Sequence, residues 1–184
     1  MRSYVIIALA FSLASSTWVL GTGLSETNQG VYLAIGGDRS TNDPIRFDER
    51  LAYYPFCNTG DVLLAEAPFE YGARIRMVGP DGQEVPKTPL GQTFGSRFDQ
   101  LHNYRDARLG SICACGPYTG LLGSVLPSAK ELFVMKAPGI YTLEIQMQMF
   151  RSGSPPDTNA ATRNPIQFSP VRIKIQKPAG LNAK

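Results

Sequence analysis

Histidine is almost absent from this chain, because His102 is the only one among 184 residues. The common catalytic motifs are also missing: there is no Gly-x-Ser-x-Gly, no His-Glu-x-x-His and no Gly-x-x-x-x-Gly-Lys-Ser/Thr. Cys113 and His102 would be the one nucleophile–base pair to consider, but a disulfide cysteine and a surface histidine are the simpler interpretation. We therefore expect no enzyme and no cofactor, with an extracytoplasmic hydrolase as the most remote alternative.

Clustered positive charge is lacking as well. The 18 Lys and Arg residues exceed the 15 Asp and Glu residues by three, and they are spread along the chain without a run. A nucleic-acid-binding protein concentrates such residues on one face, so we expect no nucleic-acid partner. With 43% apolar and 18% charged residues, the composition is that of a globular protein of one domain.

Long apolar runs are confined to the N-terminus. Arg2 precedes an apolar stretch at residues 4–13, and the small residues Ala14, Ser15 and Ser16 follow it. This layout predicts a secretory signal peptide within residues 1–23, and therefore a periplasmic or extracellular protein. An uncleaved membrane anchor is the alternative, because no charge occurs between Arg2 and Glu26.

The remaining chain has the pattern of an all-β protein. Its 18 Gly and 14 Pro residues separate short apolar runs, as turn residues do. Residues 73–78 alternate most cleanly, with Arg74 and Arg76 directed to solvent. Strands are predicted at 30–35, 45–57, 62–67, 73–78, 83–88, 131–136, 140–150 and 171–176. We expect an antiparallel β-sandwich of seven or eight strands over residues 24–177, followed by a tail at 178–184.

Residues 89–128 interrupt the alternation and are predicted to be a long insertion. Ser96 and Asp99 have the spacing of a helix-capping pair, so at most one short helix is expected there. The polar segment 152–165 contains three prolines and is predicted to be a loop.

A short motif at residues 138–143, Pro-Gly-Ile-Tyr-Thr-Leu, resembles the corner before strand F of immunoglobulin-like domains. There a tyrosine, here Tyr141, hydrogen-bonds back to the chain across the corner. The resemblance implies an immunoglobulin-like sandwich. Two hallmarks of true immunoglobulin domains are missing: Leu143 stands where the second cysteine would be, and the only tryptophan, Trp18, lies in the signal region.

Sulfur-bearing residues support two interpretations. In an oxidising compartment, two of Cys57, Cys113 and Cys115 are expected to form a disulfide, with the pairing left open. Alternatively, the spacing in Cys113/Cys115 and Met147/Met149 would place soft ligands for copper on one strand face. The simpler interpretation of the methionines is the core face of a strand, together with Leu143 and Ile145.

A binding or envelope-structural module is therefore the predicted function, with a protein or glycan as partner. The residues expected to make contacts are tyrosine, phenylalanine and arginine side chains of the insertion, which are common interface anchors: Phe94, Arg97, Phe98, Tyr104, Arg105, Arg108 and Tyr118. The loop 152–165 is a second candidate surface. The insertion would equally serve to cover a sheet edge.

Overall fold

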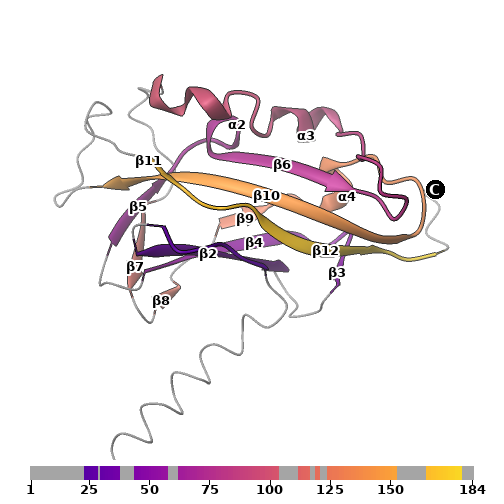
Figure 1. The fold of residues 1–184 in the computed structure, drawn as a ribbon, viewed down its shortest axis with the longest axis horizontal. Coiled ribbons are helices and arrows are strands. Elements are labelled where there is room, and N and C mark those ends of the chain that lie inside the picture. Colours follow the sequence, from indigo (N-terminus) through magenta and orange to yellow (C-terminus); the bar gives the residue numbers. More distant parts are fainter. Residues whose placement is uncertain are drawn as a thin grey trace, which may run out of the picture.

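In the computed structural model of the chain, the structure describes residues 23–28, 30–37, 44–57, 62–103, 112–116, 119–120, 124–152 and 165–179. These residues form mostly β-strands, arranged in two sheets with a hydrophobic core between them (Figure 1). The predicted all-β architecture is confirmed at this level, and two facing sheets are compatible with a sandwich.

The large sheet is organised around β10 (Gly139–Ser152), its longest strand. On one side β10 pairs with β12 (Val171–Lys177) and then with β11 (Pro165–Gln167). On the other side it pairs with β6 (Ala73–Val78) and then with β5 (Val62–Glu66). One continuous strand thus holds four shorter ones in register (Figure 1).

Short strands complete both sheets. The large sheet adds β3 (Ile45–Arg46) beside β12, β7 (Ile112–Gly116) beside β5, and β8 (Thr119–Gly120) beside β7. The small sheet has the order β1 (Gly23–Leu24), β2 (Val31–Gly37), β4 (Leu51–Cys57) and β9 (Ser124–Leu126). All pairs between named strands are antiparallel except β3 with β12, which is parallel.

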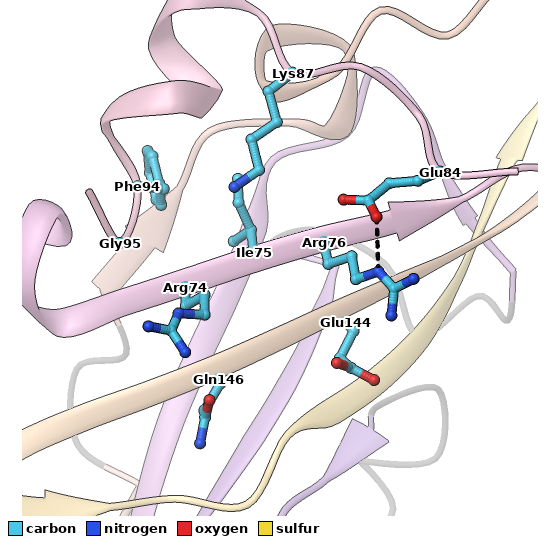
Figure 2. Close-up of a pocket in the computed structure, with 9 residues that line it drawn as sticks. All are labelled: Arg74, Ile75, Arg76, Glu84, Lys87, Phe94, Gly95, Glu144 and Gln146. Carbon is cyan, nitrogen blue, oxygen red and sulfur yellow. Dashed lines mark hydrogen bonds and ion pairs between the residues drawn. The ribbon is translucent and has the colours of Figure 1, made fainter. Parts of the chain in front are cut away.

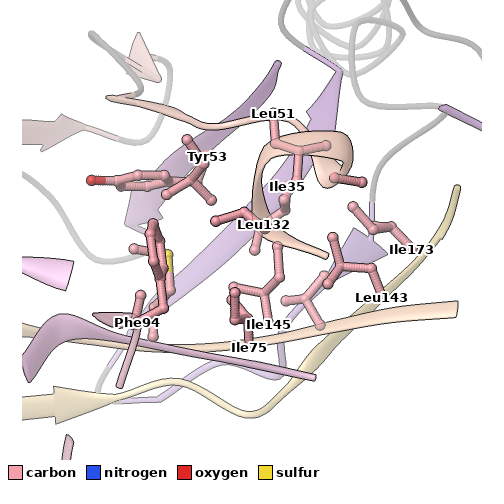
Figure 3. Close-up of a cluster of buried hydrophobic side chains, with 14 of the residues drawn as sticks. Ile35, Leu51, Tyr53, Ile75, Phe94, Leu132, Leu143, Ile145 and Ile173 are labelled. Carbon is pink, nitrogen blue, oxygen red and sulfur yellow. The ribbon is translucent and has the colours of Figure 1, made fainter. Parts of the chain in front are cut away.

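The core follows from alternation along the strands. In β10, the inward residues Leu143, Ile145, Met147 and Met149 are at most 3% exposed, whereas Thr142 faces solvent. Side chains of the small sheet, among them Ile35, Leu51 and Tyr53, meet them from the opposite layer (Figure 3). Met147 and Met149 are therefore core residues, as their spacing with Leu143 and Ile145 indicates.

The insertion takes more part in the fold than expected. It contributes β7 and β8 to the large sheet and β9 to the small one. It also contains α3 (Pro89–Thr93) and the 3-10 helix η2 (Phe98–Asn103), while α2 (Phe69–Gly72) joins β5 to β6. The prediction of at most one short helix is therefore wrong. These helices are too short to show a helical apolar period in the sequence.

Two further strand predictions are wrong, and both have a local cause. Residues 131–136 were expected to be a strand, but α4 (Ala129–Leu132) occupies the start of this segment. The hydroxyl and the backbone N–H of Ser128 each donate to the Glu131 carboxylate at 2.8 Å, which fixes the first turn. The arm 83–88 is reduced to two isolated bridges, Val78 with Glu84 and Lys87 with Phe133, because Pro86 between them donates no backbone hydrogen bond.

The predicted strand 45–57 is divided between the two sheets. Its first part, β3, pairs with β12, and its second part, β4, pairs with β2. A turn at residues 47–49 carries the chain from one layer to the other. The alternation of apolar and polar residues does not reveal a turn of this kind, because apolar residues continue on both sides of the point where the chain changes sheets.

The tyrosine corner is present as a local structure. The Tyr141 hydroxyl donates to the carbonyl oxygen of Ala137 at 2.6 Å, and the ring is 3% exposed. A phenol suits this place because it buries its ring and still satisfies a backbone carbonyl.

The first described strand ties the two sheets together. Gly23 and Leu24 pair with Ile35 and Ala34 of the small sheet. The following segment reaches the connection between β11 and β12 of the large sheet, where the Glu26 N–H donates to Ser169 Oγ at 2.6 Å. Strand β1 includes Gly23, one residue inside the range predicted for the signal peptide. A signal peptide that ends near Ser16 would leave β1 intact.

The cap of α4 predicts a pH-dependent stability. The two hydrogen bonds from Ser128 lower the pKa of Glu131, so its contribution is complete above the unfolded-state pKa and is lost as pH falls through the folded-state pKa. We expect Glu131→Gln, which removes the charge but keeps an acceptor oxygen, to reduce the free energy of unfolding by about 0.5 kcal/mol at pH 7. Urea denaturation should show this difference shrinking in acid. A loss of unfolding free energy of the same size at pH 7 and in acid would contradict the assignment. A loss of the same size in the control Glu26→Gln, whose side chain is exposed, would also contradict it.

Candidate binding groove

A groove of about 280 Å³ lies on the outer face of the large sheet, beside β6 and β10 (Figure 2). Two strands supply its floor, and the chain between Glu84 and Gly95 supplies its wall. It combines three cationic and two acidic side chains with one amide and a small apolar part. The lining residues are Arg74, Ile75, Arg76, Glu84, Lys87, Phe94, Gly95, Glu144 and Gln146.

Alternation places the polar side chains of the floor. In β6, Arg74 and Arg76 point outward while Ile75 is 2% exposed. The register with β10 sets Arg76 opposite Glu144 and Arg74 opposite Gln146. Two arginines, a carboxylate and an amide therefore share one patch of sheet surface.

The wall is held against β6 by close packing. A Cβ atom on Gly91 of α3 would lie 2.0 Å from the carbonyl oxygen of Leu132, so no larger residue fits between α3 and α4. Phe94 stacks on Phe69 with ring centroids 4.7 Å apart. Gly95, which has a φ of 70°, would bring a Cβ atom within 2.9 Å of the Arg74 Cα atom. The wall is therefore built on glycine contacts and an aromatic pair.

Ion pairs at the solvent surface engage the arginines. Arg76 Nε lies 3.1 Å from Glu84 Oε2, and Arg74 Nη2 lies 2.7 Å from Asp99 Oδ2. The Glu144 carboxylate is in turn 2.8 Å from Arg172 Nε on β12. Exposed pairs of this kind contribute about 0–1 kcal/mol each, so a ligand can replace them at little cost.

Lys87 differs from these arginines. Its side chain is partly buried and extends from the wall into the groove, toward Ile75 (Figure 2). Burial lowers the pKa of the Lys87 amine, because desolvation disfavours the charged form. No ion-pair partner for it occurs in the described part of the chain. The groove thus contains a partly desolvated ammonium group whose charge is not balanced by direct contact.

Gln148 fixes the helices beside the groove. It is 6% exposed, and its Nε2 donates to the carbonyl oxygens of Tyr71 in α2 and Phe98 in η2, both at 2.6 Å. Next to it, Phe150 packs with Ala67 and Leu101 in a second apolar cluster. The outer face of β10 is therefore covered at this end and open at the groove.

Replacing Gln148 with leucine should release this cover. Two buried carbonyl groups would lose their donor, and each unsatisfied group costs about 1–3 kcal/mol. We expect Gln148→Leu to lower the free energy of unfolding by at least about 2 kcal/mol in urea denaturation. Gln146→Leu, on the same strand but facing the groove, should change it by less than about 0.5 kcal/mol. Similar losses for the two variants would show that Gln148 does not hold the helices.

The residues predicted from the sequence to contact a partner do not form one surface. Phe94 and Phe98 are 3% and 2% exposed and belong to the packed interior, although Phe94 also borders the groove. Arg97 is exposed, and its Nη1 donates to the Tyr71 hydroxyl at 2.8 Å. Four predicted contact residues lie outside the described residues, namely Tyr104, Arg105, Arg108 and Tyr118. The predicted loop 152–165 is described only at its two ends.

The two sulfur pairs lie on strands that are not neighbours. Cys113 and Cys115 belong to β7, whereas Met147 and Met149 belong to β10, and β5 runs between these strands. Strands β7 and β10 are two strand spacings, or about 10 Å, apart. A metal–sulfur bond is only about 2.3 Å long, so the two pairs are too far apart to share one ion. The arrangement gives no support to a copper site shared by both pairs. Among the described residues, no three His, Cys, Asp or Glu side chains form a metal-binding group.

The disulfide remains a prediction. Strand β4, which ends at Cys57, is in contact with β7, which carries Cys113 and Cys115. The side chains of these cysteines, and that of His102, lie outside the described residues.

Sequence reasoning found part of the groove. The alternation of residues 73–78 predicts that Arg74 and Arg76 face solvent, and the structure confirms it. Lys87 was missed, because it stands among prolines in a segment without period, Pro86-Lys87-Thr88-Pro89. Only the tertiary fold brings it over β6.

No helix in the described ranges is long and apolar enough to cross a membrane. The chain matches no protein-family model, no curated protein and no solved structure.

Proposed function

We propose that the chain is an exported, non-catalytic binding module with an immunoglobulin-like sandwich, and that its groove receives an anionic group of a protein or glycan partner. The observation that carries the proposal is Lys87, a partly buried ammonium group that faces the groove without a direct counter-charge. An anion in the groove would offset the desolvation of this amine. Carboxylate, sulfate and phosphate groups all have the required charge and acceptor oxygens.

The surrounding groups suit this role. Arg74 and Arg76 border the same space, and their present partners, Asp99 and Glu84, are at least half exposed. Arg76 is therefore able to turn part of its donor fork to a ligand without a large loss, whereas Arg74 is also held over the Phe98 ring, 4.5 Å from its centroid. Gln146 offers a neutral amide, whereas Ile75 and Phe94 border the groove but are only 2% and 3% exposed.

Export is supported by the N-terminal sequence and is compatible with the fold. The apolar segment at residues 4–13 has the layout of a signal peptide. Two of the three cysteines would form a disulfide in an oxidising compartment. The tyrosine corner at Tyr141 supports the immunoglobulin-like assignment.

The anion site is tested by titrating the mature protein with sodium sulfate and with sodium acetate, against sodium chloride at equal ionic strength. Amide shifts in NMR spectra should concentrate at Lys87, Gly95 and Arg76. We expect Lys87→Gln to weaken sulfate binding about tenfold, since a charge-assisted contact contributes about 1.5–3 kcal/mol. Lys130→Gln, which removes the same charge from an exposed position in α4, should leave binding unchanged. Equal effects of the two substitutions, or shifts spread over all cations, would refute the site.

A further inference from the structure

The groove continues into a larger basic surface. Three strands present their outward side chains in register, so that Arg76, Glu144 and Arg172 form one row across β6, β10 and β12. The next row contains Val78, Thr142 and Lys174. Together with the groove, these rows define a surface that we call the outer basic face; its cations are Arg74, Arg76, Lys87, Arg172 and Lys174.

Positive charge exceeds negative charge on the outer basic face. Its three carboxylates, Asp99, Glu84 and Glu144, each pair with one arginine. Two of the five cations therefore remain outside these ion pairs: Lys87 in the groove and the exposed Lys174 on β12. No salt bridge of either lysine occurs in the residues the structure describes.

These two lysines lie on opposite sides of β10. Lys87 extends over β6, and Lys174 stands on β12, on the other side of the central strand. Strands β6 and β12 are two spacings apart, or about 10 Å, and outward residues repeat every 6–7 Å or so along each strand. A single small anion cannot contact both lysines. A chain with repeated negative groups can, if it crosses β10 from the groove to β12.

The other outward positions carry neutral hydrogen-bonding groups together with two apolar residues, Val78 and Ile140. Thr142 and Gln176 are exposed, and Gln146 is half-buried at the groove. In β6, β10 and β12, the outward residues that the structure describes as exposed or half-buried include no aromatic ring. Single-stranded nucleic acids are usually held by stacking on such rings, whereas sugar hydroxyls need hydroxyl and amide partners.

We propose that the outer basic face binds a linear acidic polysaccharide, with one anionic group at Lys87 in the groove and a later one at Lys174 beyond β10. This inference rests on the proposed function, since the groove provides the first contact. The ligand is then an acidic polysaccharide, and it runs across β10 from the groove to β12.

The experiment compares galacturonic acid with its oligomers of increasing length by calorimetry, using the whole mature protein. Affinity should rise with length until the oligomer spans β10, and it should fall with added salt because the contacts are ionic. Neutral galactose oligomers of equal length should not bind.

Variants separate the two ends of the surface. Lys87→Gln should weaken binding of the monomer and of every oligomer. Lys174→Gln should weaken only the long oligomers, by up to about fivefold, as expected for one exposed ionic contact. Lys130→Gln serves as the control outside the surface. We expect the exposed positions Lys130 and Lys174 to accept this substitution with little change in stability, and thermal denaturation checks that all three variants, including the one at half-buried Lys87, are folded.

The outcomes are distinct. If the monomer binds through Lys87 but length and Lys174 have no effect, the extended surface is refuted and the groove stands. If neither monomer nor oligomer binds, while sulfate shows no effect at Lys87 either, the proposed function itself fails. If a single-stranded oligonucleotide of equal charge binds more tightly and depends on Lys174, the surface selects nucleic acid and the polysaccharide assignment is wrong.

Discussion

The backbone hydrogen bonds of β10 are the constraint on which the large sheet depends. This strand pairs with β12 and β11 along one edge and with β6 and β5 along the other. Because side chains alternate, the same strand gives one row of apolar residues to the core and, from Thr142 to Gln148, one row of polar residues to the outer face. A shift of register by one residue would exchange the two rows and remove both the core and the groove.

The outer face of β10 is divided by a single buried amide. At Gln148, the two donors of the side chain end on the backbone of α2 and η2, so that this end of the strand is covered. At Glu144 and Gln146, the face stays open, because α3 and the turn at Gly95 stop beside β6. The groove exists because helices close one half of an exposed sheet face and leave the other half to solvent (Figure 1).

The electrostatics of the site follow from this division. Arg74 and Arg76 are exposed strand residues that find carboxylates at the surface, which makes their pairs weak and exchangeable. Lys87 comes from the wall and lies partly buried over the same strand, where desolvation outweighs the attraction of nearby Glu84 and no ion pair forms among the described residues. An ammonium group without an ion pair lies here beside two guanidinium groups in exposed ion pairs, one of which, that of Arg74, also lies 4.5 Å from the centroid of the Phe98 ring.

Local pattern determined the long alternating elements of this protein. Residues 73–78, 140–150 and 171–176 alternate over at least six residues, so their strand character, their buried faces and the exposure of Arg74 and Arg76 all followed from the sequence. The capping pair of Ser128 and Glu131 was also present in the sequence, but the apolar residues after it suggested a strand. Short elements such as α2, α3 and β11 depend on packing, because a few residues do not fix their own conformation. Only the tertiary structure decided that 45–57 divides between two sheets and that Lys87 lies over β6. Both depend on contacts between segments distant in the chain, and no local periodicity encodes such contacts.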